Sequence, residues 1–450
     1  MEHIVHVVHC IDTEGPLYEG LRAKLELLEH VVGITVADRT WEGFTRIVRE
    51  GAGLTPEQRQ RVREVFSPHR LHYLDTWDKL DAMLERVTAE EFRGALRDSF
   101  GGAYVYNWFC VDHVGYDINP RRRLIGYHEI FDHYADLLTR RANNARDGLH
   151  WHFHPMSFYK EAHRCAKSLL NSPHVWETLA RRVIDREWFP SCYRAGFITE
   201  RPDIHWFLEQ YVPFDFSNTS EDSASFEQQN DLTGGQLGDW RLAPRDWGVY
   251  HPSHDNYQIP GNCRRWIARC LFALNRCANL DRREVDKAFA QAQTGAPTLM
   301  GIASHDFRDL GPEVDYVRGL LAEAQAKYPG VRFKFCEAGE AFRQVAYENV
   351  CGPALDLAVR LERSAHGMPA HVTVTTARGA VFGPQPFLAI KTRSGRYVHD
   401  NLDFSPDGTS WRYVFSVNSI LPSDVAAVGV GASDRFGQTC VKTIHCSSEA

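Results

Sequence analysis

The sequence predicts an α/β domain followed by a smaller all-β domain, and three observations support this prediction. Over residues 1–348, short apolar runs rich in β-branched residues alternate with longer, charged stretches. This alternation favours a parallel sheet, either open or closed into a barrel. Ionisable side chains stand where the apolar runs end, and from about residue 352 the runs become short and β-rich. We therefore expect a second domain over residues 352–446.

The elements of the first domain follow from periodicity, taken in chain order. Residues 3–12 and 103–112 are continuous apolar runs, the pattern of strands buried on both faces. Further strands are expected at GLHWHFHP, PSCYRAG, VPFDFSN, TLMGIASHD and VRFKFCEAG. Amphipathic patterns predict helices near 127–146, 157–171, 173–186, 201–210, 282–293 and 312–328.

Two long segments interrupt the alternation. Residues 17–100 are charged and helical in pattern, and Thr55, Pro56 and Gln58 form a helix N-terminal signal there. Residues 218–262 are rich in Ser, Asn, Asp, Gly and Pro, which predicts a long surface loop.

The second domain has the pattern of a small antiparallel β-sandwich. Its β-rich runs HVTVTTA, PFLAIKT, WRYVFSV and AAVGVGA are separated by turn sequences such as RSGR and SPDGTS. We expect this domain to serve in packing or in homo-oligomer formation rather than in glycan binding.

Composition excludes several classes of protein. The 450 residues carry a net charge of −7 and no basic block, which argues against nucleic acid or an anionic membrane as the main partner. No run approaches a membrane span, and the N-terminal residues do not resemble a signal peptide, so a cytoplasmic protein is expected. The 11 cysteines form no CxxC pair and are expected to be reduced.

Polar residues at the predicted strand ends indicate a functional site, because ligands of parallel α/β folds gather at the carboxyl ends of the strands. These residues are Asp12, Glu14, His150, His152, His154, Arg194, Asp215, His305 and Asp306.

Two imidazoles and a carboxylate among them suit a metal site with an open position for water. Such a set is typical of catalytic zinc and also suits non-haem iron. His150 and His154 are four residues apart, so one compact turn of backbone would aim both rings at one point, with His152 directed elsewhere.

Five of these segments resemble, in order, the motifs of the NodB-type polysaccharide deacetylases, carbohydrate esterase family four. The segments are IDTEGP, HWHFHP, YRAG, VPFDFS and TLMGIASHD, and they fall within residues 3 to 340. The resemblance implies an irregular (β/α) barrel of about seven strands, and it makes the helical insertion at 17–100 a lid or rim over the pocket.

The resemblance also implies roles for single residues. Glu14, His150 and His154 would hold a divalent ion, most simply Zn²⁺, with Fe²⁺, Mn²⁺, Co²⁺ and Ni²⁺ left open. Asp12 would be the general base, paired with Arg194, and His305 the general acid, oriented by Asp215. His113, Trp151 and His152 are candidates for substrate contact.

The activity implied is removal of an N-acyl group, most simply acetyl, from a sugar-containing substrate. With no secretion signal expected, a glycoconjugate precursor is favoured over a cell-wall polymer. Two alternatives stay open: a degenerate relative that binds glycans or partners without catalysis, and an iron oxygenase with two histidines and one carboxylate.

Overall fold

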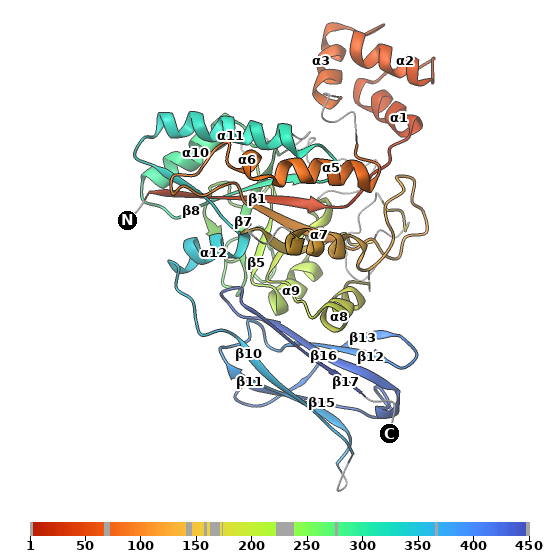
Figure 1. Cartoon of the computed structure of the whole chain (residues 1–450), viewed down its shortest axis with the longest axis vertical. Helices are drawn as coiled ribbons and strands as arrows, with labels where there is room; N and C mark the ends of the chain where they lie inside the picture. Colours follow the sequence, from red (N-terminus) through yellow and green to blue (C-terminus); the bar gives the residue numbers. More distant parts are fainter. Residues whose placement is uncertain are drawn as a thin grey trace.

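The computed structural model describes residues 3–66, 73–140, 146–156, 160–162, 172, 174–221, 238–274, 278–364 and 368–446. The chain forms a helix-covered barrel with a β domain beneath it and a small helical unit at one corner (Figure 1). Across these residues, no helix is long and apolar enough to cross a membrane.

Within the described residues, seven parallel strands close into a barrel, which confirms the barrel form of the α/β prediction. The strands are β1 (Ile4–Thr13), β2 (Tyr106–Val111), β3 (Gly148–Phe153), β4 (Cys192–Ala195), β5 (Phe214–Asn218), β7 (Trp266–Phe272) and β8 (Thr298–His305). Pairing of β1 with β2 closes the ring, and all seven strands are almost wholly buried.

The sequence pattern did not predict β7, and it predicted β9 (Arg332–Phe335) without showing that β9 lies outside the ring. β9 pairs with the first residues of β1, whereas β2 pairs with the last ones. The pattern of β7 is interrupted by Arg269, a charged residue buried there because it forms an ion pair with Glu284.

Helices cover the outside of the barrel (Figure 1). They are α5 (Trp77–Thr88), α6 (Glu90–Arg93), α7 (Glu129–Arg140), α8 (His174–Arg186), α9 (Pro202–Tyr211), α10 (Arg282–Gln293), α11 (Leu310–Lys327) and α12 (Ala338–Tyr347). The bounds of α8, α9, α10 and α11 agree with the predicted helices to within two or three residues, as does the start of α7, whereas α12 was not predicted. The helix predicted at 157–171 lies largely outside the described residues, as does the predicted end of α7.

The segment 17–100 is not one insertion, as the sequence had predicted, but two parts. Helices α1 (Leu21–Val32), α2 (Trp41–Thr45) and α3 (Pro56–Val65) share a small core of their own and project beyond the carboxyl end of β1 (Figure 1). α5 and α6 belong instead to the barrel, because Leu80, Met83 and Leu84 pack into its main core. The predicted capping signal is present, since Thr55 and Gln58 form a capping box at α3.

The segment 218–262 is only partly a surface loop. Its described part carries Trp240, Trp247 and Tyr250 into the main core, and the short strand β6 (Val249–Tyr250) pairs with β7 in antiparallel fashion. Residues 222–237 lie outside the described part of the chain.

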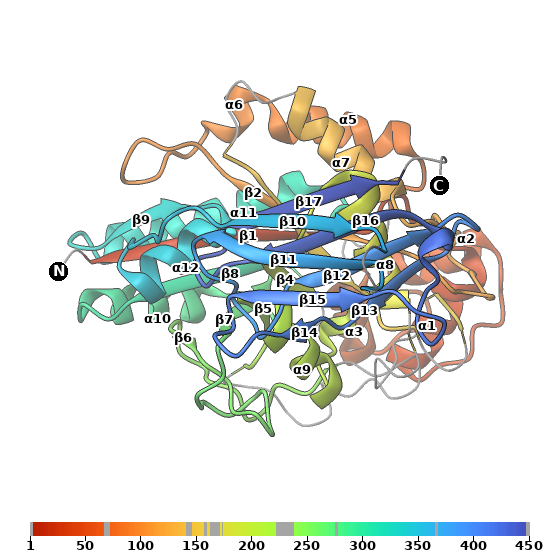
Figure 2. The same cartoon turned by 90° about the horizontal axis from the view of Figure 1, so that it is seen from below.

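The C-terminal domain consists of two antiparallel sheets, ordered β10-β11-β15-β14 and β13-β12-β16-β17 among the described residues. The strands are β10 (Asp356–Glu362), β11 (His371–Arg378), β12 (Phe387–Thr392), β13 (Tyr397–Asp400), β14 (Asp403–Phe404), β15 (Ser410–Val414), β16 (Val425–Ser433) and β17 (Thr439–His445). Both sheets contribute to one core, and Phe387, Ala389 and Ala427 pack against α8 and α9. Figure 2 shows the long strands of this domain running side by side across the barrel.

Buried histidines make the fold sensitive to acid, and His9 on β1 is the clearest case. Its ring nitrogens lie 2.7 Å from the Tyr104 hydroxyl and 2.8 Å from the Ser304 hydroxyl, and burial lowers the pKa of His9 to about 3. Unfolded chains bind a proton at histidine below about pH 6.5, so His9 costs the fold stability as the pH falls from there.

We predict that His9→Gln flattens the dependence of the unfolding free energy on pH. Without His9, the unfolded chain binds one proton fewer between about pH 4 and 6. The slope of the unfolding free energy against pH should therefore change by about 1.4 kcal/mol per pH unit in this range. Urea titrations of both proteins across this range measure the two slopes, and equal slopes would contradict the prediction.

Candidate metal centre

The end of β1 carries the two carboxylates of the site, and Asp306 holds that end in place. Asp306 accepts hydrogen bonds from the backbone N–H groups of Glu14 (2.8 Å) and Gly15 (2.9 Å) and from the Tyr134 hydroxyl (2.8 Å). Gly15 has a positive φ of 70°, a backbone conformation that glycine adopts without strain. The chain therefore turns directly after Glu14, which leaves Asp12 and Glu14 at the mouth of the barrel.

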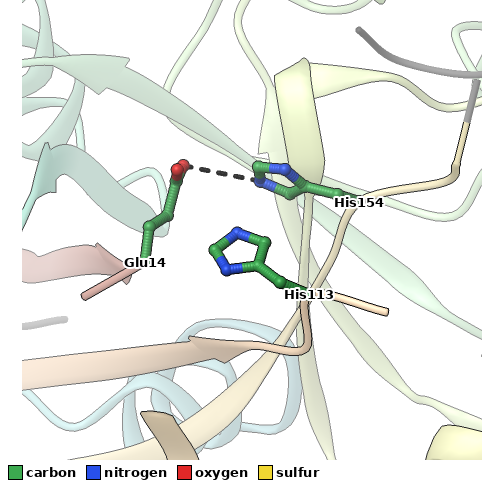
Figure 3. A group of neighbouring side chains, drawn as sticks. All are labelled: Glu14, His113 and His154. Atoms are coloured by element: carbon green, nitrogen blue, oxygen red, sulfur yellow. Dashed lines mark ion pairs between the residues drawn. The ribbon is translucent and has the colours of Figure 1, made fainter. Parts of the chain in front are cut away.

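Glu14, His113 and His154 form a buried group able to hold a metal ion, because one ligand atom from each lies within 4.8 Å of the others. Figure 3 shows the two imidazoles facing the Glu14 carboxylate. His154 Nε2 lies 3.4 Å from Glu14 Oε1. His113 and His154 come from segments that directly follow β2 and β3, so the group stands at the carboxyl ends of neighbouring strands.

His152 lies next to this group and is oriented like a metal ligand. Its Nδ1 donates to the carbonyl oxygen of Arg194 at 2.8 Å, so Nε2 keeps its lone pair, and this Nε2 lies 2.9 Å from His154 Nε2. A backbone carbonyl on the far nitrogen is the usual way in which a ligating histidine is held. The structure thus places His113 and His152, both expected at the substrate, among the potential ligands.

His150 was predicted as a ligand with Glu14, and this prediction is wrong. Its Nε2 contacts Asn107 Oδ1 (3.1 Å) and Glu337 Oε1 (3.3 Å), and it belongs to a separate group with Cys192 and Glu337. The predicted compact turn does not form, because β3 stays extended to Phe153. Four residues of strand span about 13 Å, which places His150 well below His154 in the barrel.

The predicted contact between Asp12 and Arg194 is present. Arg194 Nε lies 2.8 and 3.0 Å from the two Asp12 oxygens, and its Nη1 donates to the Phe216 carbonyl at 2.9 Å. Burial by itself would lower the pKa of Arg194, but the Asp12 charge outweighs this and raises it. Arg194 therefore stays charged inside the barrel and holds Asp12 in one orientation.

His305 faces both carboxylates, since its Nε2 lies 3.8 Å from Asp12 Oδ2 and 3.9 Å from Glu14 Oε1. The orienting residue is Arg308, whose Nη2 donates to His305 Nδ1 at 3.0 Å. Burial and the Arg308 charge hold the pKa of His305 well below its ordinary value. The ring is therefore neutral, with its single proton on Nε2.

Two further predictions of site residues are wrong. Asp215 does not orient His305, because its carboxylate accepts from the backbone N–H of Ser217 (2.8 Å) and from Arg265 Nη1 (2.5 Å). Trp151 does not face the pocket. Side chains alternate along β3, and Trp151 points away from the pocket. It packs against Tyr193 and Phe207, in the buried layer that β3 and β4 form with α8 and α9.

Arg123 is a site residue that no sequence pattern indicated. It pairs with Glu14 Oε2, and its Nη1 lies 3.5 Å from His113 Nε2. Burial would raise the pKa of Glu14, but the charges of Arg123 and His154 hold it well below its ordinary value. Arg123 lies in the irregular segment after β2, where an arginine has no periodicity to mark it.

Comparison of the chain with protein-family models, with curated proteins and with solved structures finds no match. The geometry itself therefore defines the site. It combines buried carboxylate and imidazole donors suited to a divalent ion, a second carboxylate fixed by arginine, and a histidine N–H directed at both.

We predict that metal binding depends on His113 and His154 and not on His150. His113→Ala and His154→Ala should each lower zinc affinity by about 10-fold or more, because each removes a donor to the ion. His150→Ala should leave affinity within about threefold, since its imidazole is held by Asn107 and Glu337. Titration against a zinc-binding dye measures all three, and a loss confined to His150→Ala would reverse the ligand assignment.

We predict that Gly196→Ala disturbs the same site through His154. A Cβ at Gly196 would lie 2.1 Å from His154 Cδ2 and 2.6 Å from the Phe153 carbonyl oxygen. Such contacts require the imidazole to move, so zinc affinity should fall by about 10-fold or more. Gly319→Ala on α11 is the matched control, because its Cβ would meet no atom within 4 Å. Unchanged affinity in Gly196→Ala would contradict the prediction.

Proposed function

We propose that this protein is a metal-dependent hydrolase that removes an N-acyl group, most simply acetyl, from a sugar-containing substrate. The observation that carries the proposal is the position of the Asp12–Arg194 pair beside the Glu14–His113–His154 group, with His305 facing both carboxylates. A hydrolytic site needs a polarising centre, a base and a donor toward the reacting oxygen, and each has a candidate residue here.

Glu14, His113 and His154 would hold the ion, with His152 in reach as a further ligand. Zn²⁺ fits this donor set, and it would lower the pKa of a bound water and polarise the amide carbonyl. The other divalent transition metals remain alternatives, because carboxylate and imidazole donors also accept them.

Asp12 is the base in this proposal. Its carboxylate is held in one orientation by Arg194 and lies two residues before Glu14, so it is placed to take a proton from the attacking water. The same carboxylate, once protonated, can return that proton to the leaving nitrogen.

His305 has a different role in this proposal from the acid role that the family resemblance implies. An acid needs the imidazolium form, and burial together with Arg308 opposes that form. A neutral ring with Nε2–H directed at the site is instead a hydrogen-bond donor for the oxygen on which negative charge develops.

The sugar part of the proposal is supported by the five motifs that resemble the NodB-type deacetylases, now with His113 in place of His150 among the ligands. Two histidines and one carboxylate would also suit an iron oxygenase. The buried Asp12–Arg194 pair favours a hydrolase over an iron oxygenase and over a protein that binds without catalysis. Neither of these two alternatives requires an oriented base beside the metal.

We predict that Asp12→Asn abolishes hydrolysis while leaving zinc bound. Loss of a positioned base typically lowers turnover by about 10²- to 10⁴-fold, and the zinc ligands are unchanged. Release of acetate from a panel of N-acetylated sugars, with zinc content measured in parallel, tests this. Asp255→Asn is the control, because the Asp255 side chain is 92% exposed. An Asp12→Asn enzyme with near-normal turnover would refute the role of Asp12.

A further inference from the structure

Three arginines surround the candidate metal group, and each is almost completely buried. Arg123, Arg194 and Arg308 are 6%, 0% and 5% exposed. Arg123 pairs with Glu14, Arg194 with Asp12, and Arg308 with Glu313 at 3.4 Å. Each arginine is thus paired with one carboxylate, so the three pairs together carry no net charge when all six groups are ionised.

A divalent ion held by Glu14, His113 and His154 upsets this balance. It adds two positive charges and takes over the carboxylate that otherwise neutralises Arg123. Among the described residues, Asp306 is the further acidic group that contacts the end of β1, where it binds the backbone of Glu14 and Gly15. Even a fully ionised Asp306 would leave one positive charge uncompensated. An uncompensated charge in a buried site is costly, so the loaded site favours a ligand that brings negative charge.

Two of the guanidinium groups have nitrogens available for such a ligand. Arg123 Nε is buried and has no hydrogen-bond partner among the described residues. Arg308 uses Nη2 on His305 and directs Nε toward Glu313, and in the described part of the chain no bond is made by its Nη1. Arg308 Nη2 lies 3.0 Å from His305 Nδ1, and Arg123 Nη1 lies 3.5 Å from His113 Nε2. Each arginine therefore lies beside a histidine of the candidate site, Arg123 beside His113 and Arg308 beside His305.

We propose that the substrate carries an anionic oxygen group, a carboxylate or a phosphate, near the scissile amide, and that Arg123 and Arg308 bind it. This inference rests on the proposed function for the reaction, but the binding it describes does not require turnover. Arginine suits this task because its planar fork matches the paired oxygens of carboxylate and phosphate.

Calorimetry on the zinc-loaded full chain tests the proposal with three probes: N-acetylglucosamine, its 1-phosphate, and the analogue oxidised to a carboxylate at C6. We expect at least one anionic probe to bind about 10-fold or more tightly than the neutral sugar. The order of affinity of the two anionic probes shows which of these two groups, a phosphate at C1 or a carboxylate at C6, the site accepts better.

Arg123→Gln and Arg308→Gln should each remove most of this preference. Arg122→Gln should keep it, because Arg122 is exposed and its guanidinium stacks on Tyr18 at 4.0 Å. Arg308→Gln remains decisive if Arg123→Gln fails to hold zinc. Equal binding of the three probes, or an equal loss in Arg122→Gln, would overturn the proposal.

Acetate release measured on the same samples separates the two hypotheses. Release without preference for an anionic probe supports the hydrolase and refutes the anion site. Preference without release supports the anion site and refutes the hydrolase.

Discussion

The candidate site depends on the way in which β1 closes the barrel. β1 pairs with β8 over most of its length, with β9 only at its beginning and with β2 only at its end. Closure therefore occurs at the end that carries Asp12, where β8 lies on one side and β2 on the other. Asp306, which follows β8, completes this arrangement by binding the backbone of Glu14 and Gly15. Asp12 is thereby held within β1, and Glu14 is held at the residue that directly follows this strand.

The alternation of side chains along β3 explains which histidines reach the site. His150, His152 and His154 occupy alternate positions, so all three turn to the same face of the strand. Trp151 and Phe153 turn outward and pack with residues of α8 and α9. Their heights in the barrel differ, and only the last two reach the level of Glu14. His113, which follows the neighbouring strand β2, takes the place that had been predicted for His150. Contributions from the ends of adjacent strands are the geometry expected of a site shared between parallel strands.

Much of this fold is predictable from local pattern, and the site is predictable only in part. Alternation of buried runs with amphipathic stretches identified the strand that carries Asp12 and the helices that cover it, because these patterns reflect burial directly. The sequence pattern did not predict β7, because Arg269 looks like a solvent-exposed residue in the sequence. Its burial is explained only by its ion pair with Glu284, which the structure shows. The sequence also contained no indication of the roles of Arg123 and Arg308 or of the ion pair between Asp215 and Arg265. Polar contacts of this kind leave no periodic pattern in the sequence.

One helix, α8, contacts both the β domain and a residue next to the candidate metal centre. On one side, Val183 and Ile184 of α8 pack against the sheet that contains β12 and β16. On the other, Arg182 reaches inward to Asp112, the residue before His113, at 2.7 Å. Asp185 of the same helix accepts from the Tyr397 hydroxyl of β13 at 2.6 Å. Without the β domain, α8 would expose its apolar face to solvent, and Asp185 would lose its hydrogen bond from Tyr397. The same helix holds Asp112, which precedes the candidate ligand His113. The domain is thus better understood as part of the support for the barrel than as an independent binding module.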